Sequence, residues 1–519
     1  MLKLPLPISV LTDSYKAGHF AQYPDAKEMI AYGEFRAPFK TLEDDHRLVF
    51  TGIRYIVDNV LSQKWTVEDV EKADAFYSTH NAAFTPYPFP KDEFLRFIKE
   101  NNGYFPVRIE AIAEGTAIYP HVPVYQITAR GHYSKLVTFL ETLLTMVWYP
   151  STVATLSRRT RCVVEDAFEK SVDKDAFWKI DSRLHDFGFR GCTCLEQATI
   201  GGVAHLLNFR GSDTMAACYY AQYVLNNGKP IAQSIPATEH SVMTSWKNEQ
   251  AAIRNMITKF GKGVFACVMD SYDYANAMQN ILPQIKAEKL KQGGFMVCRP
   301  DSGDPTEAIL LGLEAEEKCF GVTKNKKGFK VINGAGVIQG DGINIHNVKE
   351  ILNAMMDKGY SAENSAFGMG SGLLQKVNRD TMSFATKLCH VKYADGTERD
   401  AMKTPKTDGG KYSLPGRLKV IRNKSGIPIV HCGTEKDVNT KDNLLKVVYD
   451  CGPVDVKWMN FDDLRDYVDS TYKALPKKAD VIGDDLKVKI TKMLQANKDR
   501  VANMRSEERR VGKECRSRW

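Results

Sequence analysis

Residues 263–305 read GVFACVMDSYDYANAMQNILPQIKAEKLKQGGFMVCRPDSGDP. The stretch holds two short apolar runs, and each run ends in a polar cluster, DSYD at 270–273 and RPDSGDP at 299–305. A segment with helical periodicity separates the two runs. Short apolar runs that alternate with helices are typical of strand–loop–helix units, which build parallel sheets with right-handed crossovers.

The same rhythm extends to both sides of this stretch. Apolar runs end in polar or glycine-rich clusters at SRLHDFGFRG (182–191), IAQSIPATEHS (231–241), GAGVIQGDGI (334–343) and NSAFGMGSGLLQK (364–376). The number of units favours a barrel over an open sheet. In an α/β barrel the loops that follow the strands meet on one face, where active sites lie. We therefore predict a barrel-like βα-repeat domain of the α/β class at residues 151–380.

The regions that flank this domain lack the rhythm. Residues 1–150 mix helical and strand patterns, and residues 381–504 begin with strand-like segments and end in helices. We predict a flanking α+β sheet domain built from these N- and C-terminal parts. Residues 505–519, RSEERRVGKECRSRW, have neither period and resemble a translated sequencing adapter. We expect this segment to be a non-native tail.

Composition excludes several classes of protein. The 519 residues are 43% hydrophobic and 26% charged, which is ordinary for a globular chain. The net charge of +8 is mild and comes without a long basic run, so we expect no nucleic-acid partner. No apolar stretch reaches the roughly 18 residues of a membrane span. The 11 cysteines include no C-x-x-C pair, which indicates reduced thiols in a cytoplasmic protein.

Two glycine clusters follow predicted strands, GDG at 340–342 and GMGSG at 368–372. Glycines at such positions let a phosphate approach the backbone, and a following helix supplies N–H groups. A tight turn between strand and helix is the alternative. Arg299 and Asp301 share one loop, where they suit a phosphate and a ribose or magnesium-bound water, or else form an ordinary salt-bridged loop.

Together the clusters indicate a sugar phosphate, a magnesium ion and a titratable histidine, His240, on one face of the barrel. Seven motifs then carry a family resemblance. The chain resembles the nicotinamide phosphoribosyltransferase family in the following segments, which occur in the same order: TDSYKAGHFAQYP (12–24), LHDFGFRG (184–191), PATEHS (236–241), DSYD (270–273), RPDSGDP (299–305), IQGDG (338–342) and SGLLQK (371–376).

The resemblance runs from about Leu11 to about Arg417. It implies a type II phosphoribosyltransferase, which is an obligate homodimer with shared active sites. Such enzymes make nicotinamide mononucleotide and pyrophosphate from nicotinamide and phosphoribosyl pyrophosphate. The resemblance also implies Mg²⁺ as cofactor and ATP as co-substrate, with ATP hydrolysis coupled through a phosphohistidine.

The resemblance assigns the base site to four residues. Phe187 and Tyr15 are similar to the two rings that sandwich the pyridine, and Tyr15 would come from the second subunit. Arg190 resembles a residue that contacts the base or a nearby phosphate. Asp213, in RGSDT, resembles the acceptor for the carboxamide NH₂, where it would repel the carboxylate of nicotinate. Asp213 could equally serve as a helix N-cap, and both roles are compatible.

The remaining roles concern phosphates. His240 resembles the phosphorylated histidine, with Glu239 and Asp273 expected to orient its ring. The resemblance assigns the ribose-phosphate site to Arg299, Asp301, Gly340, Asp341, Gly370 and Ser371. It assigns the cations around pyrophosphate and ATP to Arg36, Arg379, Lys387, Lys403 and Lys411.

Two other functions remain open at this point. One is nicotinate phosphoribosyltransferase, with the same chemistry on a different base. The other is a catalytically silent phosphosugar-binding or signalling protein on the same fold. Asp213 argues against the first, and the complete set of site residues argues against the second.

Overall fold

The computed structural model describes residues 6–403 and 412–499, which form two compact units. The α/β unit contains residues 149–378 and 459–469. The flanking unit contains the described residues before 149, those from 379 to 458 and those after 469. Residues 459–469 therefore group with the α/β unit, although their sequence suggested the flanking part. The tail at 505–519 lies outside the described residues.

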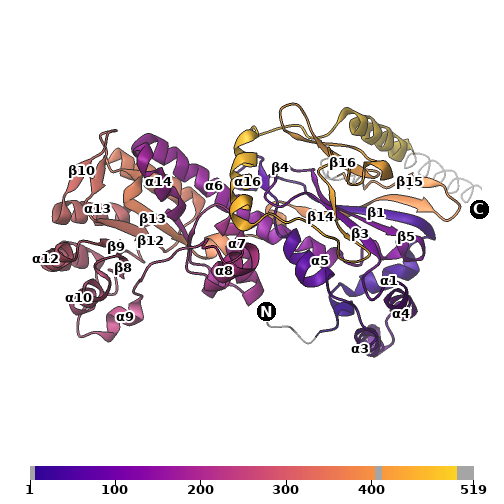
Figure 1. The fold of residues 1–519 in the computed structure, drawn as a ribbon, viewed down its shortest axis with the longest axis horizontal. Coiled ribbons are helices and arrows are strands. Elements are labelled where there is room, and N and C mark those ends of the chain that lie inside the picture. The colour runs from indigo at the N-terminus through magenta and orange to yellow at the C-terminus, as the bar shows by residue number, and fades with distance from the viewer. Residues whose placement is uncertain (1–5, 404–411, 500–519) are drawn as a thin grey trace, which may run out of the picture. The chain divides into compact units, whose positions relative to one another are not determined.

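The α/β unit is built around six parallel strands in the order β7–β6–β13–β12–β9–β8. Helices lie outside this sheet (Figure 1). Because parallel strands are covered on both faces, they appear in the sequence as continuous apolar runs, as in GVFACV. The strands are β6 (Leu184–Asp186), β7 (Gly211–Ser212), β8 (Val264–Val268), β9 (Phe295–Arg299), β12 (Ala335–Gln339) and β13 (Ser365–Met369).

The helices of this unit begin at clear local signals. Asp304 caps α13 by accepting from the N–H groups of Thr306 and Glu307, and Pro305 occupies the first turn. Gly293 ends α12 at φ 80°, a conformation that glycine adopts without strain. The helices are α6 (Trp148–Ser171), α7 (Leu195–Leu206), α8 (Met215–Tyr219), α9 (His240–Ser245), α10 (Glu249–Phe260), α11 (Tyr274–Asn276), α12 (Leu282–Gln292), α13 (Pro305–Phe320), α14 (Ile345–Asp357) and α15 (Ser371–Leu374), and a hairpin joins β10 (Val322–Lys324) to β11 (Lys330–Ile332).

An irregular segment links the two edge strands of the parallel sheet. Gln233 forms a single parallel bridge with Gly211 of β7, and Ala237 forms another with Ala266 of β8. The sequence predicted a strand at 231–241, but the structure has only these bridges. Pro236 lies between them and has no N–H to donate, which prevents a continuous ladder. The sheet is curled into a half-barrel whose two edge strands are both bridged by this segment, so the predicted barrel-like arrangement is confirmed.

The flanking unit contains an antiparallel sheet in the order β15–β14–β1–β5–β3–β18. The three central strands come from the N-terminal part, and the outer strands come from the C-terminal part. The prediction of a sheet domain built from both parts is thus confirmed. The strands are β1 (Ala26–Phe35), β3 (Val107–Ala111), β5 (Pro123–Arg130), β14 (Phe384–Tyr393), β15 (Glu398–Asp400) and β18 (Lys446–Asp450).

Shorter elements complete the flanking unit. Two small ladders pair β2 (Leu48–Val49) with β4 (Ala117–Ile118) and β16 (Leu418–Arg422) with β17 (Pro428–Cys432). The helices are α1 (Ser14–Gln22), α2 (Ile53–Ile56), α3 (Val67–Tyr77), α4 (Lys91–Glu100) and α5 (Glu141–Thr145). Helix α16 (Phe461–Ala474) belongs to the α/β unit as far as Asp469.

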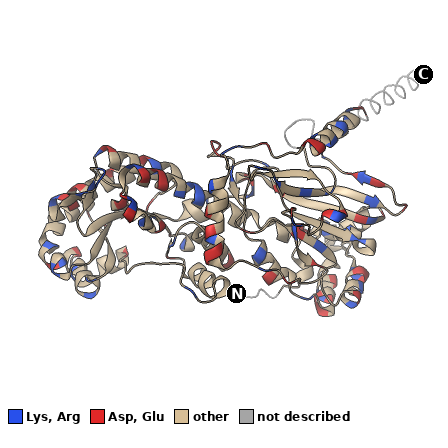
Figure 2. Ribbon diagram, turned by 45° about the horizontal axis from the view of Figure 1, so that its top comes forward, with Lys and Arg blue, Asp and Glu red and all other residues tan. Residues whose placement is uncertain are grey.

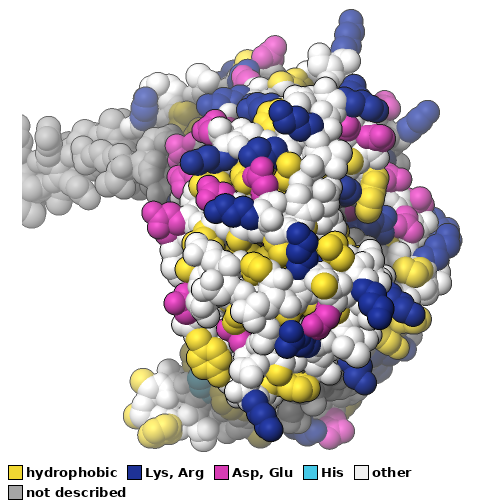
Figure 3. Space-filling model, turned by 90° about the vertical axis from the view of Figure 1, so that its left-hand side faces the viewer, with side chains coloured by type: hydrophobic (Ala, Val, Ile, Leu, Met, Phe, Trp, Pro, Cys, Tyr) yellow, Lys and Arg dark blue, Asp and Glu magenta, His cyan; other side chains and the backbone are white. Residues whose placement is uncertain are grey.

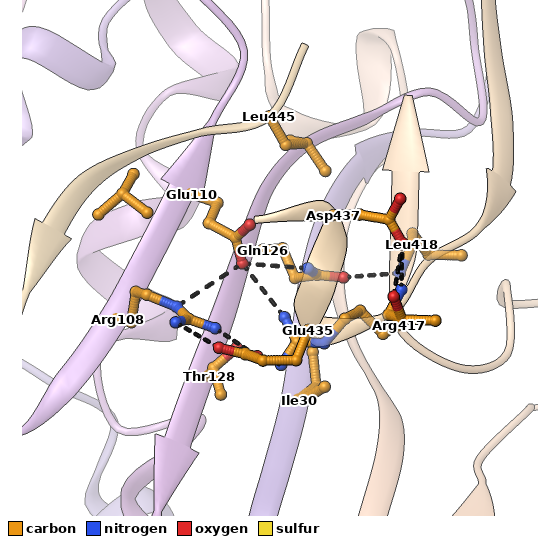
Figure 4. Close-up of polar contacts among 12 residues, drawn as sticks. Ile30, Arg108, Glu110, Gln126, Thr128, Arg417, Leu418, Glu435, Asp437 and Leu445 are labelled. Carbon is orange, nitrogen blue, oxygen red and sulfur yellow. Dashed lines mark hydrogen bonds and ion pairs between the residues drawn. The ribbon is translucent and has the colours of Figure 1, made fainter. Parts of the chain in front are cut away.

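Arginines tie the C-terminal part of this unit to its N-terminal strands (Figure 4). Both terminal nitrogens of Arg108 donate to the Glu435 carboxylate, each at 2.8 Å. Arg130 donates to the same carboxylate at 2.7 Å, and Arg417 lies 2.9 Å from it. Arg417 also pairs with the buried Glu110 at 3.3 Å. Multiple charge-assisted contacts of this kind hold Glu435 in place more firmly than a single surface ion pair.

The surface charge is mixed, as the mild net charge and the lack of a long basic run in the sequence predicted. Basic and acidic residues are interspersed along the described chain (Figure 2). On the face of the α/β unit drawn in Figure 3, Lys and Arg side chains are dispersed among neutral and acidic ones. No helix within residues 6–403 and 412–499 has both the length and the apolar character needed to cross a bilayer. Every cysteine in these ranges is a free thiol.

A buried carboxyl group lies between the sheet and the helices of the α/β unit. Glu316 on α13 is fully buried, and neither of its oxygens has a hydrogen-bond partner among the described residues. Burial raises the pKa of Glu316 to about 8. The side chain therefore carries its proton at neutral pH.

This carboxyl should make stability depend on pH. The pKa of Glu316 is higher in the folded state than in the unfolded state, so its contribution to stability is complete below about pH 4.5 and is lost as pH rises through about 8. We expect Glu316→Gln to have a free energy of unfolding higher than that of the wild type at pH 8.5, by on the order of 4 kcal/mol, and to match it to within about 1 kcal/mol at pH 5, as urea unfolding would measure. If the free energies of unfolding of the two proteins changed with pH in the same way, the raised pKa of Glu316 would be wrong.

Candidate active site

The site residues of the α/β unit lie where its strands end. The carboxyl ends of parallel strands meet at one edge, so residues from distant motifs converge there. Five residues of this edge follow the end of a strand by one or two positions. They are Phe187 after β6, Asp213 after β7, Asp270 after β8, Asp301 after β9, and Gly340 after β12.

Phe187 lies against two glycines at neighbouring strand ends. A Cβ atom added to Gly368 would lie 2.0 Å from Phe187 Cε2, and one added to Gly340 would lie 3.2 Å from the same atom. The guanidinium of Arg299 lies 5.8 Å from the centre of the ring. The backbone N–H of Phe187 donates to the carbonyl of Met369 at 3.1 Å. The aromatic ring is therefore fixed beside a cation at the mouth of the barrel.

The close approach at Gly368 gives a direct test of this aromatic position. Gly368→Ala should displace the Phe187 ring, because its methyl group cannot share the space that the ring occupies. We expect the KM for the pyridine base that the family resemblance implies to rise by about tenfold or more, which corresponds to a loss of about 1.4 kcal/mol. Steady-state kinetics would measure the change. Gly263→Ala is the control, since its added Cβ would come no closer than 3.8 Å to its nearest neighbour.

Asp213 is exposed at the end of β7 and does not cap a helix. Its carboxylate accepts from Ser234 Oγ at 2.6 Å, and its backbone N–H donates to the Asp186 carbonyl at 3.0 Å. The N-cap of α8 is Thr214 instead. The N-cap role considered for Asp213 is therefore wrong, and the carboxylate faces solvent with one oxygen held. Arg190 is also exposed, in the short turn after Phe187.

His240 is held at both ring nitrogens. Its Nε2 lies 3.3 Å from Asp301 Oδ2 and 4.0 Å from Asp270 Oδ1, and its Nδ1 lies 3.1 Å from Ser271 Oγ. The side chain remains 48% exposed. A carboxylate at Nε2 favours a proton on that nitrogen, which leaves the lone pair on Nδ1. The ring is thus oriented and accessible.

The carboxylates that orient His240 differ from those predicted. Glu239 accepts instead from Ser241 Oγ, and Asp273 caps α11 by accepting from the Asn276 N–H. Glu239 has extended backbone, φ −120° and ψ 175°, in which successive side chains point to opposite sides. Its neighbour His240 therefore turns away from it. The expected orienting roles of Glu239 and Asp273 do not match the structure.

Asp301 connects His240 to Arg299. Arg299 Nη2 donates to Asp301 Oδ2 at 2.6 Å, and this oxygen is the one that faces His240. Asp270 steadies the same loop, because its Oδ2 accepts from Asp301 N at 2.8 Å and Ser302 Oγ at 2.6 Å. Sequence reasoning missed the part played by Asp270, although its place in DSYD at a strand end was a usable signal.

The loop after β12 has fewer free backbone N–H groups for a phosphate than its glycine-rich sequence predicted. Gln339 Oε1 accepts from the N–H groups of Gly340 and Asp341, at 2.8 and 3.1 Å. Asn344 caps α14 and accepts from two further N–H groups. These donors are therefore occupied by side chains. Asp341 and Ser371 are exposed, and Gly370 is the N-cap of the four-residue α15.

The flanking unit gathers three of the predicted cations. Burial lowers the pKa of Lys387, and the positive charges of Arg36 and Lys403 lower it further. Arg36 donates through Nε to the Ser383 carbonyl at 3.1 Å. Arg379 is exposed and pairs with Asp380 at 3.3 Å. Lys411 lies outside the described residues.

Tyr15 belongs to the flanking unit and is 52% exposed. Its hydroxyl donates to Asp13 Oδ2 at 3.3 Å, and its ring centre lies 5.3 Å from that of His19. The next residue, Lys16, is buried and forms an ion pair with Glu141. The ring of Tyr15 is therefore anchored at its base and free to contact a further molecule.

The described residues offer no complete metal cage. Within residues 6–403 and 412–499, no group of three or more His, Cys, Asp or Glu side chains is arranged to hold a metal ion. Asp270 Oδ1 is buried and has no hydrogen-bond partner in these ranges. This donor set fits an ion such as Mg²⁺ that is carried by substrate phosphates and waters, with one or two carboxylates nearby.

Sequence comparisons agree with this arrangement. The profile of the nicotinate phosphoribosyltransferase (NAPRTase) family matches residues 182–452, and that of the nicotinamide phosphoribosyltransferase N-terminal domain matches residues 7–109. A nicotinamide phosphoribosyltransferase of Xanthomonas campestris is 38% identical over 80% of this chain and 87% of its own length. One of Acinetobacter baylyi is 28% identical over 87% of this chain and 95% of its own.

Solved structures support the fold. The crystal structure of human nicotinic acid phosphoribosyltransferase matches with a TM-score of 0.61 at 16% identity, over 93% of this chain and all of that one. The fold, the converging site and the sequence relatives define the chain as a phosphoribosyltransferase. Within that class it belongs to the nicotinate phosphoribosyltransferase family, whose profile covers more than half of its residues.

Proposed function

We propose that the protein is a nicotinamide phosphoribosyltransferase of NAD salvage. It would make nicotinamide mononucleotide and pyrophosphate from nicotinamide and phosphoribosyl pyrophosphate. The observation that carries this proposal is the position of Phe187 beside Arg299 at the mouth of the barrel. An aromatic ring and a cation are thus adjacent where a flat base must meet a phosphorylated sugar. The names of the relatives support the same reaction.

The choice of nicotinamide depends on Asp213. Its exposed carboxylate accepts a hydrogen bond from the carboxamide NH₂ of nicotinamide, whereas nicotinate would present a second negative charge. The hydrogen bond from Ser234 fixes one carboxylate oxygen and leaves the other for the ligand. The stacking partners are Phe187 and Tyr15, each worth about 0.5–1.5 kcal/mol beyond area burial.

The transfer step needs little covalent chemistry from the protein. The pyridine nitrogen attacks the anomeric carbon of the ribose as the bond to pyrophosphate breaks, and negative charge grows on the leaving group. Arg299 stabilises that charge. Mg²⁺ bound to the phosphates adds Lewis-acid stabilisation of the same charge. Asp301 holds Arg299 in position, and its carboxylate is the group that we assign to the ribose hydroxyls.

ATP coupling is assigned to His240. Nδ1 attacks the γ-phosphorus of ATP, an N–P bond forms, and the bond to the ADP oxygen breaks. Asp301 supports this step by holding the proton on Nε2 and stabilising the positive charge that develops on the ring. The shared carboxylate of Asp301 links the phosphohistidine to the arginine of the sugar site.

We propose a homodimer in which Tyr15 of one protomer reaches the base site of the other. Met215, Tyr219 and Tyr223 lie on one helical face at intervals of four residues and are 64%, 64% and 56% exposed. An exposed apolar row of this kind favours a protein interface. The exposed ring of Tyr15 also favours a partner. Sedimentation of the purified protein would test the assembly.

The experiment that tests the function is a transfer assay. The protein is incubated with phosphoribosyl pyrophosphate, Mg²⁺ and ATP, and nicotinamide or nicotinate is supplied in parallel. Mass spectrometry identifies the product. We expect mononucleotide from nicotinamide only. Product from nicotinate alone would favour the rival base, and no product from either would favour a phosphosugar-binding protein without catalysis.

A further inference from the structure

Asp186 connects the two segments that contact the base in the proposed function. It is the last residue of β6, immediately before Phe187, and is fully buried. Its carboxylate Oδ1 accepts from the Gly188 N–H at 2.7 Å, and its backbone carbonyl accepts from the Asp213 N–H at 3.0 Å. One residue therefore fixes the turn that carries Phe187 and the strand end that carries Asp213.

We propose that Asp186 is a positioning residue for the pyridine base, and that its charge state controls how tightly the base is bound. The proposal rests on the proposed function, because it concerns the same site. Asp186 does not touch the base itself. It acts through the Phe187–Gly188 turn and through Asp213.

Close packing keeps water from the second carboxylate oxygen. A Cβ atom added to Gly202 of α7 would lie 3.0 Å from Asp186 Oδ2 and 2.5 Å from Ala217 Cβ. Oδ2 is buried and forms no well-aligned hydrogen bond among the described residues, although the Thr214 hydroxyl lies near enough to stabilise its charge. The carboxylate therefore depends on the Gly188 N–H for its main stabilising contact, and the strength of that contact depends on its charge.

The groups that face Asp186 supply no positive charge. They are Asp213 on the adjacent strand end, Tyr149 on α6, Cys192 in the loop before α7, and Cys218 on α8. Burial and, to a smaller extent, the negative charge of Asp213 raise the pKa of Asp186, while the Gly188 N–H and Thr214 lower it, and together they leave this pKa at about 6. Burial lowers the pKa of the neighbouring His185, whose Nε2 donates to the Ser182 carbonyl instead.

This geometry has a consequence for binding. Above about pH 6 the ionised carboxylate makes a charge-assisted bond to Gly188, which fixes the turn. Below that pH the protonated group is a weaker acceptor, so the turn and the Phe187 ring become less well ordered. The KM for the base should therefore rise as pH falls through 6, while the KM for phosphoribosyl pyrophosphate changes less.

Two variants of Asp186 test the proposal. Asp186→Asn keeps an oxygen acceptor for Gly188 and does not titrate, so the rise in base KM below pH 6 should disappear. Asp186→Ala removes the acceptor and should raise the base KM by about tenfold at pH 8, with a smaller change in kcat. Steady-state kinetics and calorimetric titration of the base from pH 5.5 to 8.5 would measure both. If asparagine restores part of the base affinity that alanine loses, the effect of Asp186→Ala comes from lost positioning of the base site and not from a failure to fold.

Glu316→Gln is the matched control, because Glu316 is also a fully buried carboxyl of the α/β unit with a raised pKa. It should leave the pH profile of the base KM unchanged. An asparagine variant that keeps the wild-type profile would overturn the proposal. The base used is whichever one the wild type transfers, so a wrong assignment of nicotinamide would appear in the wild-type assay and not in these variants.

Discussion

Replacing Asp213 with asparagine is expected to let the enzyme accept nicotinate. The wild type should prefer nicotinamide because the Asp213 carboxylate and the nicotinate carboxylate repel each other. At 4 Å the repulsion between two unit charges is about 1 kcal/mol in bulk water and about 4 kcal/mol at an effective dielectric of 20. Asp213 is exposed in the free protein, so the lower part of this range applies unless the bound base excludes water.

The expected change is therefore about a five- to thousandfold loss of discrimination, measured as the ratio of kcat/KM for the two bases. Ser234→Ala is the control, since it removes the hydrogen bond to Asp213 but keeps the charge. It should reduce kcat/KM for nicotinamide with little gain for nicotinate. If Asp213→Asn still rejects nicotinate as strongly as the wild type, the base is selected elsewhere in the site.

Replacing His240 with alanine is expected to abolish the coupling to ATP. The imidazole is the proposed nucleophile. Its ring is the group that Ser271, Asp270 and Asp301 hold in position, and an alanine side chain offers no nitrogen for them to orient. We expect ATP hydrolysis to fall by about a hundredfold or more, while transfer from phosphoribosyl pyrophosphate to the base continues without the ATP-driven gain in yield.

Two measurements would check this result. Phosphohistidine formation from γ-labelled ATP should be lost, and ADP release should fall in parallel. His346→Ala serves as control, because His346 is an exposed histidine on α14 whose backbone N–H is held by Asn344. Its ATP hydrolysis should equal that of the wild type. Unchanged hydrolysis in His240→Ala would show that the proposed phosphohistidine is wrong.

The fold could be predicted because its units repeat. Buried parallel strands leave continuous apolar runs, and the polar cluster after each run marks the strand end, as for β8 and DSYD. The segment at 231–241 was predicted as a strand, but Pro236 interrupts its ladder of backbone hydrogen bonds. The apolar pattern of the segment does not show this interruption. Residues 459–469 could not be assigned to the α/β unit from sequence, since only tertiary packing decides which unit a terminal segment joins.

The site was predicted in outline rather than in its contacts. Sequence proximity suggested that Glu239 orients His240, but extended backbone turns neighbouring side chains apart, and Asp301 from another loop takes that position. The occupation of loop N–H groups by Gln339 depends on a side-chain rotamer. Asp186 gave no signal as a functional residue, because its effect comes from burial and from two hydrogen bonds across the strand end.

The order of strands in the flanking sheet determines how the chain can fold during synthesis. Strands β1, β5 and β3 leave the ribosome early, yet both outer edges of this trio await β14 and β18. Roughly 300 residues separate the end of β5 from the start of β18, which takes about 15–60 s to translate at 5–20 residues per second. The free edge of β1 is open to pairing with other nascent chains until β14 is made, and the free edge of β3 is open for the whole interval. The α/β unit is completed later still, because its segment 459–469 follows β18, and Arg108 and Arg130 meet Glu435 only after about 300 further residues have been made.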